Sequence, residues 1–379
     1  MKIPFLDLKK VNAELEQDIH LAVKTVIDSG WYILGKSGEI FEQNSKTALV
    51  GDGEGYVLGC NSGTDALVLS LLAAGVGPGD EVITVSHTAI PTVCAINAVG
   101  AHPVYVDIDA DTWVMDVNQF LAAVTHKTRA VIPVHLYGNM VDMDSLKNDI
   151  ASIHESQINI IEDVAQAQGS RLTAREAGTL GRLGAFSFYP SKNIGALGDG
   201  GAVFCHFSED MIALKSLRNY GQHDRYSADR LRGINSRLDE VQAAILDIKL
   251  KRLHEWNQKK STLMRFFRNA LSDLPIQFQK ITPGCEPAWH LCVIALADHE
   301  TRESLFKYLN NEGIQTLIHY PIPNHRQKAF DRDSQQSLPV TENLAKKILS
   351  LPFNTALSQE NIEYMMGKIR SFFSHNKTT

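Results

Sequence analysis

The chain of 379 residues is 44% hydrophobic and 21% charged, which is typical of a globular protein with room for one large and one smaller domain. Its 37 basic and 43 acidic residues give a net charge of -6 without a basic run, which argues against nucleic acid as a partner. The charged N-terminus, the lack of a bilayer-length apolar segment and five scattered cysteines without CxxC spacing predict a cytoplasmic protein with neither disulfides nor a metal site.

The first predicted elements are helices. Val11–Ser29 repeats apolar residues at helical spacing, and a second short helix is expected over Glu39–Leu49. From Tyr56 onward, β-rich runs alternate with helical patterns such as Thr64–Ala74 and Pro91–Val99. The predicted strands are Tyr56–Cys60, Val82–Val85, Val104–Val106, Ala130–Val134 and Ile158–Ile161. This alternation predicts an α/β domain with a mostly parallel sheet and helices on both faces.

The C-terminal part has a different pattern. A long helical stretch, Leu238–Phe267, is expected to connect the α/β domain to a separate unit. That unit contains a predicted strand, Leu291–Leu296, and predicted helices over Thr301–Glu312, Leu338–Ser350 and Glu360–Phe373. We therefore expect residues 1–250 to form a helical N-terminal arm and a large α/β domain, and residues 251–379 to form a smaller α+β domain.

A single lysine stands out in the segment Gly184–Phe204. Lys192 follows the strand-like run Ala-Phe-Ser-Phe-Tyr and precedes a glycine-rich loop. A lysine that forms a Schiff base needs a rigid, desolvated position of this kind, and glycines allow the backbone to approach a bulky cofactor. A surface lysine in a glycine-rich turn is the alternative.

Two acidic residues, Glu162 and Asp163, close an apolar strand within Asn159–Gly169. The carboxyl ends of parallel strands are where ligands bind in open α/β sheets. A carboxylate there can keep a pyridine nitrogen protonated, which makes the ring an electron sink. The alternative is an acid that caps a helix.

A third segment, Asn61–Leu67, places Ser62, Gly63 and Thr64 between a strand and a helix. Their N–H and hydroxyl groups can bind phosphate at a helix N-terminus, although an ordinary capped turn has the same composition. The chain has neither a Walker A loop nor a GxGxxG after a strand. A phosphorylated cofactor fits these observations better than a nucleotide in a standard loop.

Nine blocks together resemble one family. In order, they are NSGTDAL, PGDEVITVSHTAIPTV, PVHLYG, IEDVAQAQG, FSFYPSKNIGALGDGG, LRNYG, GINSRLDEVQAAIL, IHYPIP and LPVTENLAKKILSLPF. In order and spacing they are similar to the DegT/DnrJ/EryC1/StrS sugar aminotransferases over nearly the whole chain. The resemblance implies the aspartate-aminotransferase fold of type I pyridoxal-phosphate enzymes and a homodimer with active sites at the subunit interface.

The resemblance also implies residue roles. Lys192 matches the Schiff-base lysine, and Asp163 matches the partner of the pyridine nitrogen. The other matched cofactor ligands are Gln166 beside the ring, Gly63, Thr64 and Ser187 at the phosphate, and Asn235, which reaches the phosphate of the partner subunit. Matched blocks make Arg237, His319, Tyr320 and His325 candidates for substrate binding.

One position departs from the family. Where the family usually has an aromatic residue that stacks on the cofactor ring, this chain has Ala89. We therefore expect either that His87 supplies the stacking face or that Ala89 packs flat against the ring.

The implied reaction is a two-step transfer of an amino group. L-glutamate is the expected donor and a nucleotide-linked keto-hexose the expected acceptor, with pyridoxal 5′-phosphate as carrier. The alternatives are a sugar dehydratase and a non-catalytic regulator on the same scaffold. Lys192 argues against the dehydratase, in which a histidine replaces the lysine, and Asp163 and Gln166 argue against the regulator.

Overall fold

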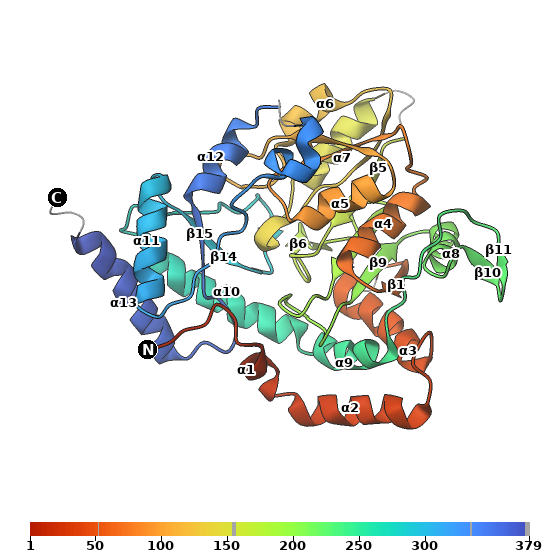
Figure 1. Cartoon of the computed structure of the whole chain (residues 1–379), viewed down its shortest axis with the longest axis horizontal. Coiled ribbons are helices and arrows are strands. Elements are labelled where there is room, and N and C mark those ends of the chain that lie inside the picture. Colours follow the sequence, from red (N-terminus) through yellow and green to blue (C-terminus); the bar gives the residue numbers. More distant parts are fainter. Residues whose placement is uncertain (52, 154–156, 334–335, 376–379) are drawn as a thin grey trace.

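The computed structural model describes residues 1–51, 53–153, 157–333 and 336–375 (Figure 1). Its centre is a seven-stranded sheet in the order β1-β9-β8-β5-β4-β2-β3. The strands are β1 (Tyr56–Cys60), β2 (Glu81–Val85), β3 (His102–Val106), β4 (Thr128–Val131), β5 (Asn159–Asp163), β8 (Leu183–Ser187) and β9 (Gly201–Cys205). The five strands predicted for the large domain are confirmed: β1 has its predicted bounds, and β2, β3, β4 and β5 have shifted ends.

The sheet is mostly parallel, as predicted. β5 pairs in parallel with β4 and β8, and β2 pairs in parallel with β3 and β4. β9 is antiparallel to both of its neighbours, β8 and β1. The five residues of β9 are all buried; Gly200 precedes them and His-Phe-Ser follows. This short run was not predicted as a separate strand.

Helices of the large domain follow the strands. The predicted helices after β1 and β2 are α4 (Gly63–Ala73) and α5 (Ile90–Ala98), each beginning one residue earlier than expected. The predicted helix Val11–Ser29 is two helices, α1 (Leu8–Ala13) and α2 (Glu16–Ser29), and α3 (Lys36–Ser45) continues as a π-helix, Lys46–Val50. The remaining helices of this part are α6 (Phe120–Ala123), α7 (Met143–Ser152) and α8 (Ser208–Leu217).

Small strand pairs lie outside the main sheet. Strands β10 (Gln222–Asp224) and β11 (Ser227–Ala228) form a hairpin that projects beside α8 (Figure 1). Another small sheet contains β6 (Arg171–Leu172), β7 (Arg175–Glu176) and β13 (Cys285–Glu286).

In the described residues, none of the helices has the length and apolar character needed to cross a membrane.

A second antiparallel sheet organises the C-terminal part. It contains β12 (Gln277–Phe278), β14 (Cys292–Ala295) and β15 (Ile348–Leu351), with α11 (His299–Asn311) and α13 (Gln359–His375) nearby. The predicted helix Leu338–Ser350 is wrong in its last turn, because α12 (Pro339–Lys347) ends where β15 begins. All four residues of β15 are buried and pair with β14, so tertiary pairing overrides the helical pattern.

The predicted connector Leu238–Phe267 is also interrupted. It forms α9 (Glu240–Leu250) and α10 (Leu253–Ala270), which Figure 1 shows leading from the large sheet towards the C-terminal one. Two hydrophobic cores accompany the two sheets, and Ile3 from the N-terminus packs in the second. We propose a domain boundary near residue 250 because α9 ends there.

Candidate active site

A cavity of about 220 Å³ lies where β1, β5 and β8 end. These strands run in the same direction, so their carboxyl ends share one edge of the sheet. Its lining contains six of the residues predicted to bind or activate a cofactor: Ser62, Gly63, Thr64, Asp163, Ser187 and Lys192. The structure therefore brings three separate sequence segments to one site.

The N-terminus of α4 forms one wall. Ser62 caps the helix by accepting a hydrogen bond of 3.1 Å from the Asp65 N–H, which leaves Gly63 and Thr64 at the cavity. A Cβ atom on residue 63 would lie 2.5 Å from the Ser187 Cβ, so only glycine fits. A helix N-terminus beside the Ser187 hydroxyl is a site that suits phosphate.

The two neighbouring acids have different partners. Asp163 Oδ2 accepts a 2.8 Å hydrogen bond from Thr92 Oγ1, and its other oxygen accepts one from the Ala165 N–H. Glu162 points to the other side of the strand, where it accepts bonds from His135 and three backbone N–H groups. Only Asp163 reaches the cavity.

Hydrogen bonds explain the ionisation of Glu162. Burial works to raise the pKa of this carboxyl, but the hydrogen bond from His135 and the backbone N–H groups outweigh it and lower the pKa. His135 Nδ1 accepts from the Val141 N–H, so Nε2 carries the proton that it donates to Glu162. Glu162 is therefore a satisfied structural carboxylate.

Lys192 lies at the junction of this cavity and a second one. Burial lowers the pKa of its ammonium group to about 8, although Asp163 opposes the shift. A substantial fraction of the amine is therefore neutral near pH 8. The turn that carries Lys192 is held by Gln168, which donates to the Ser187 carbonyl at 2.6 Å and accepts from the Ile194 N–H at 2.7 Å.

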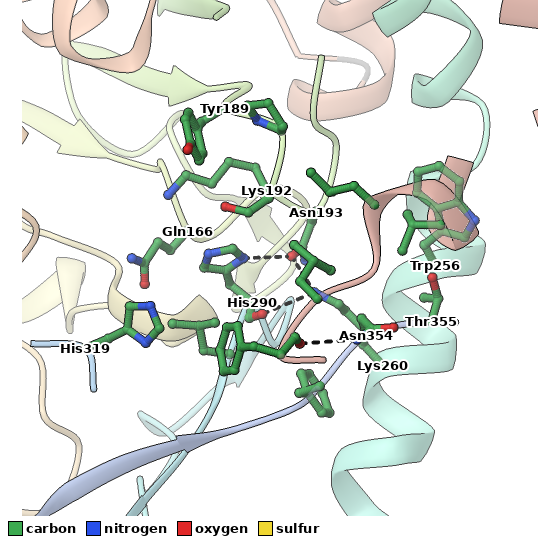
Figure 2. Close-up of a pocket in the computed structure, with 18 of the residues that line it drawn as sticks. Gln166, Tyr189, Lys192, Asn193, Trp256, Lys260, His290, His319, Asn354 and Thr355 are labelled. Carbon is green, nitrogen blue, oxygen red and sulfur yellow. Dashed lines mark hydrogen bonds between the residues drawn. The ribbon is translucent and has the colours of Figure 1, made fainter. Parts of the chain in front are cut away.

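The second cavity, of about 240 Å³, contains Gln166 and His319 in its wall (Figure 2). Tyr320 also lines it. Gln166 accepts a hydrogen bond from the Tyr137 N–H and donates one to the Tyr320 hydroxyl, both at 2.9 Å. This arrangement orients the Tyr320 side chain in the wall that also contains Lys192. Burial, despite the Gln166 hydrogen bond, raises the pKa of Tyr320 to about 12.

Ala89, not His87, lines the first cavity. The His87 ring packs edge-on against Tyr137, and its Nε2 lies 2.9 Å from the Tyr137 hydroxyl. That hydroxyl donates its only proton to the His319 carbonyl, so His87 Nε2 must be the donor to it. The geometry gives the stacking role of His87 no support, and we propose that Ala89 faces the ring.

The remaining candidates lie elsewhere. Within the described residues, neither cavity is lined by Arg237, His325 or Asn235. Arg237 donates to Asn219, and buried His325 bonds to Ser86 and Glu342. Asn235 is exposed, as a residue directed towards a partner must be. The cofactor role of Asn235 and the substrate roles of the other two stay predictions.

The residues of the second cavity that were not predicted include Asn193, Lys260 and His290. A signal for Lys260 exists in the sequence. The buried side chains of α10 include Trp256, Lys260, Met264 and Phe267, so a lysine occupies the apolar stripe of an amphipathic helix.

The family model of DegT/DnrJ/EryC1/StrS aminotransferases matches residues 13–370. The chain belongs to this family. It is 41% identical over 374 residues to the dTDP-3-amino-3,4,6-trideoxy-α-D-glucose transaminase of Streptomyces venezuelae, covering 98% of this chain and 96% of that one. It is 39% identical over 368 residues to the UDP-N-acetyl-3-dehydro-α-D-glucosamine 3-aminotransferase of Acidithiobacillus ferrooxidans, covering 97% of each.

A differently named relative is also similar. The erythromycin biosynthesis sensory transduction protein EryC1 of Saccharopolyspora erythraea is 42% identical over 381 residues, covering 98% of this chain and all of that one.

Solved structures of family members match the fold. The X-ray structure of S. venezuelae DesV in complex with ketimine intermediate has a TM-score of 0.92 at 40% identity, covering 98% of both chains. NtdA of Bacillus subtilis, with bound cofactor PMP, has a TM-score of 0.90 at 30% identity, covering 98% of this chain and 85% of that one. The predicted aspartate-aminotransferase fold and family are confirmed.

This aminotransferase uses pyridoxal 5′-phosphate. The residues present fit that group. A helix N-terminus with a glycine that admits no Cβ suits the phosphate, a buried carboxylate suits the pyridinium nitrogen, and a lysine with a lowered pKa suits the aldehyde.

Proposed function

We propose that this pyridoxal-phosphate-dependent nucleotide-sugar transaminase moves an amino group from L-glutamate to the keto group of a nucleotide-linked hexose. The position of Lys192 carries the proposal. Its side chain lies between a cavity that fits the cofactor and a second cavity that opens beside it. The named relatives act on dTDP- and UDP-linked sugars, which supports the acceptor class.

When bound, pyridoxal phosphate supplies a carbonyl carbon for the amino group and a ring that withdraws electrons. Asp163, fixed by Thr92, holds the proton on the ring nitrogen. Lys192 Nζ, with its pKa near 8, can accept and return a proton at the reacting carbon. Tyr320, oriented by Gln166, can donate its hydroxyl proton towards a substrate oxygen.

We also propose a homodimer. Three large apolar side chains near the cofactor cavity are solvent-exposed in the single chain, with exposed fractions of 46% for Ile90, 56% for Tyr189 and 49% for Leu197. Apolar side chains gathered at one place on a surface favour a protein interface. A second copy would bury these side chains and could bring its own Asn235 to the phosphate.

We keep the cytoplasm as the proposed compartment. All five cysteines are free thiols in the structure, which is compatible with a reducing environment.

The proposal is tested with the purified protein, pyridoxal phosphate, L-glutamate and a panel of dTDP- and UDP-linked 3-keto and 4-keto hexoses. We expect 2-oxoglutarate to form with at least one sugar, and an amino sugar of matching amount to appear by mass spectrometry. Formation of a dehydrated sugar without 2-oxoglutarate would support the dehydratase instead. Absence of any product from the entire panel would support the regulator.

A further inference from the structure

Lys260 is a buried amine without an anionic partner. Its side chain is 8% exposed, and its ammonium group donates to Asn193 Oδ1 at 2.8 Å and to the His290 carbonyl at 3.2 Å (Figure 2). Both acceptors are neutral, and no carboxylate of the described chain forms an ion pair with Lys260. The Phe353 ring, whose centre lies 5.6 Å from Lys260 Nζ, is also neutral. Buried charges are normally paired, so the protonated form is costly here unless a ligand supplies a negative charge.

The surrounding cavity favours an anion. Taking the described residues alone, its lining contains Lys192 and Lys260 but no Asp or Glu. Burial first, and then the nearby Lys192, lower the pKa of His319 to about 4, and similar causes hold the pKa of His290 well below its usual value. The two histidines are therefore neutral at pH 7, so among the described residues of the wall only the two lysines can carry a positive charge near neutral pH.

The polar groups around Lys260 are held in place. Asn193, which follows Lys192 directly, donates to Asn257 Oδ1 at 2.9 Å and to the Ala288 carbonyl at 2.8 Å. Its Oδ1 atom accepts from Lys260 and lies 3.3 Å from His290 Nδ1. The ammonium group of Lys260 is thus fixed close to the residue next to Lys192 in the chain.

We propose that Lys260 binds a carboxylate of the amino-acid donor. This inference rests on the proposed function, since it assigns the donor subsite of the same reaction. In the transfer, the amino group must lie at Lys192, and an α-amino acid carries a carboxylate on the carbon that bears this amino group. Protonated Lys260 offers a positive charge to that carboxylate, or to the side-chain carboxylate of L-glutamate, in the same cavity, and the bound anion would favour the protonated form.

The acceptor fits this subsite less well. In a nucleotide-linked hexose, the negative charges lie on the diphosphate, beyond the sugar ring from the keto carbon. The cavity of about 240 Å³ is also smaller than the roughly 300–1,000 Å³ typical of pockets for drug-sized ligands. An amino acid matches both its size and its charge.

The chain provides a matched control in Lys249. It is also buried, and its ammonium group donates to the Gly195 carbonyl at 2.6 Å, on the same turn that carries Lys192. Burial lowers the pKa of Lys249 to about 8, as it lowers that of Lys260 to about 7. Lys249 does not contribute to either described cavity wall, so its substitution removes a buried lysine and its bond to the Lys192 turn without removing a group from the proposed subsite.

The experiment measures binding of succinate, an unreactive dicarboxylate, to the holoenzyme by isothermal titration calorimetry. We expect Lys260→Met to weaken succinate binding at least tenfold, Lys260→Arg to retain most of it, and Lys249→Met to match the wild type. Unfolding midpoints establish that each variant is folded. Unchanged succinate affinity in Lys260→Met, or failure of the wild type to bind succinate, would overturn the proposal.

Single-turnover reactions with L-glutamate and L-alanine identify the carboxylate. If Lys260→Met loses apparent affinity equally for both donors, Lys260 binds the α-carboxylate. If it loses affinity for L-glutamate alone, Lys260 binds the side-chain carboxylate. If the wild type binds succinate through Lys260 but converts no amino acid to its keto acid, the proposed function fails and the anion subsite stands. If it converts donors and Lys260→Met does so with unchanged affinity, the subsite fails and the function stands.

Discussion

Thr92 Oγ1 donates a 2.8 Å hydrogen bond to Asp163 Oδ2, across 71 residues of sequence. The Thr88 hydroxyl lies 3.0 Å from Thr92 Oγ1. Because Thr92 has one hydroxyl proton and gives it to Asp163, Thr88 must donate to Thr92. The start of α5 is thereby connected to the carboxylate of Asp163, which lines the first cavity.

Thr92→Val should weaken cofactor binding. The substitution keeps the side-chain shape but removes a hydrogen bond to a charged group, which contributes about 1.5–3 kcal/mol. We expect the dissociation constant for pyridoxal phosphate, measured by equilibrium dialysis, to rise at least about tenfold. Thr88→Val, which leaves the bond to Asp163 in place, is the control. Equal affinities in both variants and the wild type would show that Thr92 does not position Asp163.

The adjacent acids should respond differently to neutralisation. Asp163→Asn removes the charge at the cavity, so we expect turnover to fall by about 10²-fold or more with little change in the unfolding midpoint. Glu162→Gln places an NH₂ group near backbone N–H donors and should destabilise the fold by about 1–3 kcal/mol. Denaturant unfolding and the transaminase assay measure the two effects. A reversed pattern would assign the catalytic role to Glu162.

The lowered pKa of Lys192 predicts how the apoprotein takes up its cofactor. Only the neutral amine attacks an aldehyde, and burial lowers the pKa of this amine to about 8 from 10.5, against the opposing effect of Asp163. The rate of reconstitution with pyridoxal phosphate should therefore rise with pH and level off above about 8. Stopped-flow absorbance measures this rate. A rate that continues to rise towards pH 10 would mean that Lys192 has an ordinary pKa.

Lys260 should make stability depend on pH. Its pKa is lowered by burial to about 7 in the folded protein, and the unfolded chain has 10.5. Between these values the unfolded state binds more protons, so the free energy of unfolding rises with pH across this window. Lys260→Met should reduce that slope by up to about 1.4 kcal/mol per pH unit. Urea unfolding at pH 7, 8 and 9 measures the slope, and an unchanged slope would show that Lys260 remains charged when folded.

The sequence predicted the local elements of the large domain well because its strands and helices are short and clearly bounded. β5 and α4 follow directly from an apolar run and from a capped start at Ser62. The strand β15 was missed because Ile348–Leu351 continues a helical pattern and becomes a strand only by pairing with β14. Pairing between distant segments leaves little local signal.

Contacts between distant segments also limited the prediction of the site. Asp163 could be found because it ends a strand, and Lys192 because it follows one, whereas the partners that make Glu162 structural, His135 and the turn at Gly178, are distant in sequence. His87 was considered for stacking because it is close to Ala89 in sequence. Its orientation is determined by Tyr137, 50 residues away. A role for Lys260 could not be predicted without knowing that α10 faces the cavity.

Borohydride reduction of the holoenzyme tests the central claim most directly. Sodium borohydride converts the imine between pyridoxal phosphate and a lysine into a stable secondary amine, which peptide mass spectrometry locates. Two lysines of the second cavity, Lys192 and Lys260, have lowered pKa values and could each react. We expect the modification on Lys192 alone and its loss in Lys192→Ala; modification of Lys260 in the wild-type protein would show that Lys192 is not the Schiff-base lysine.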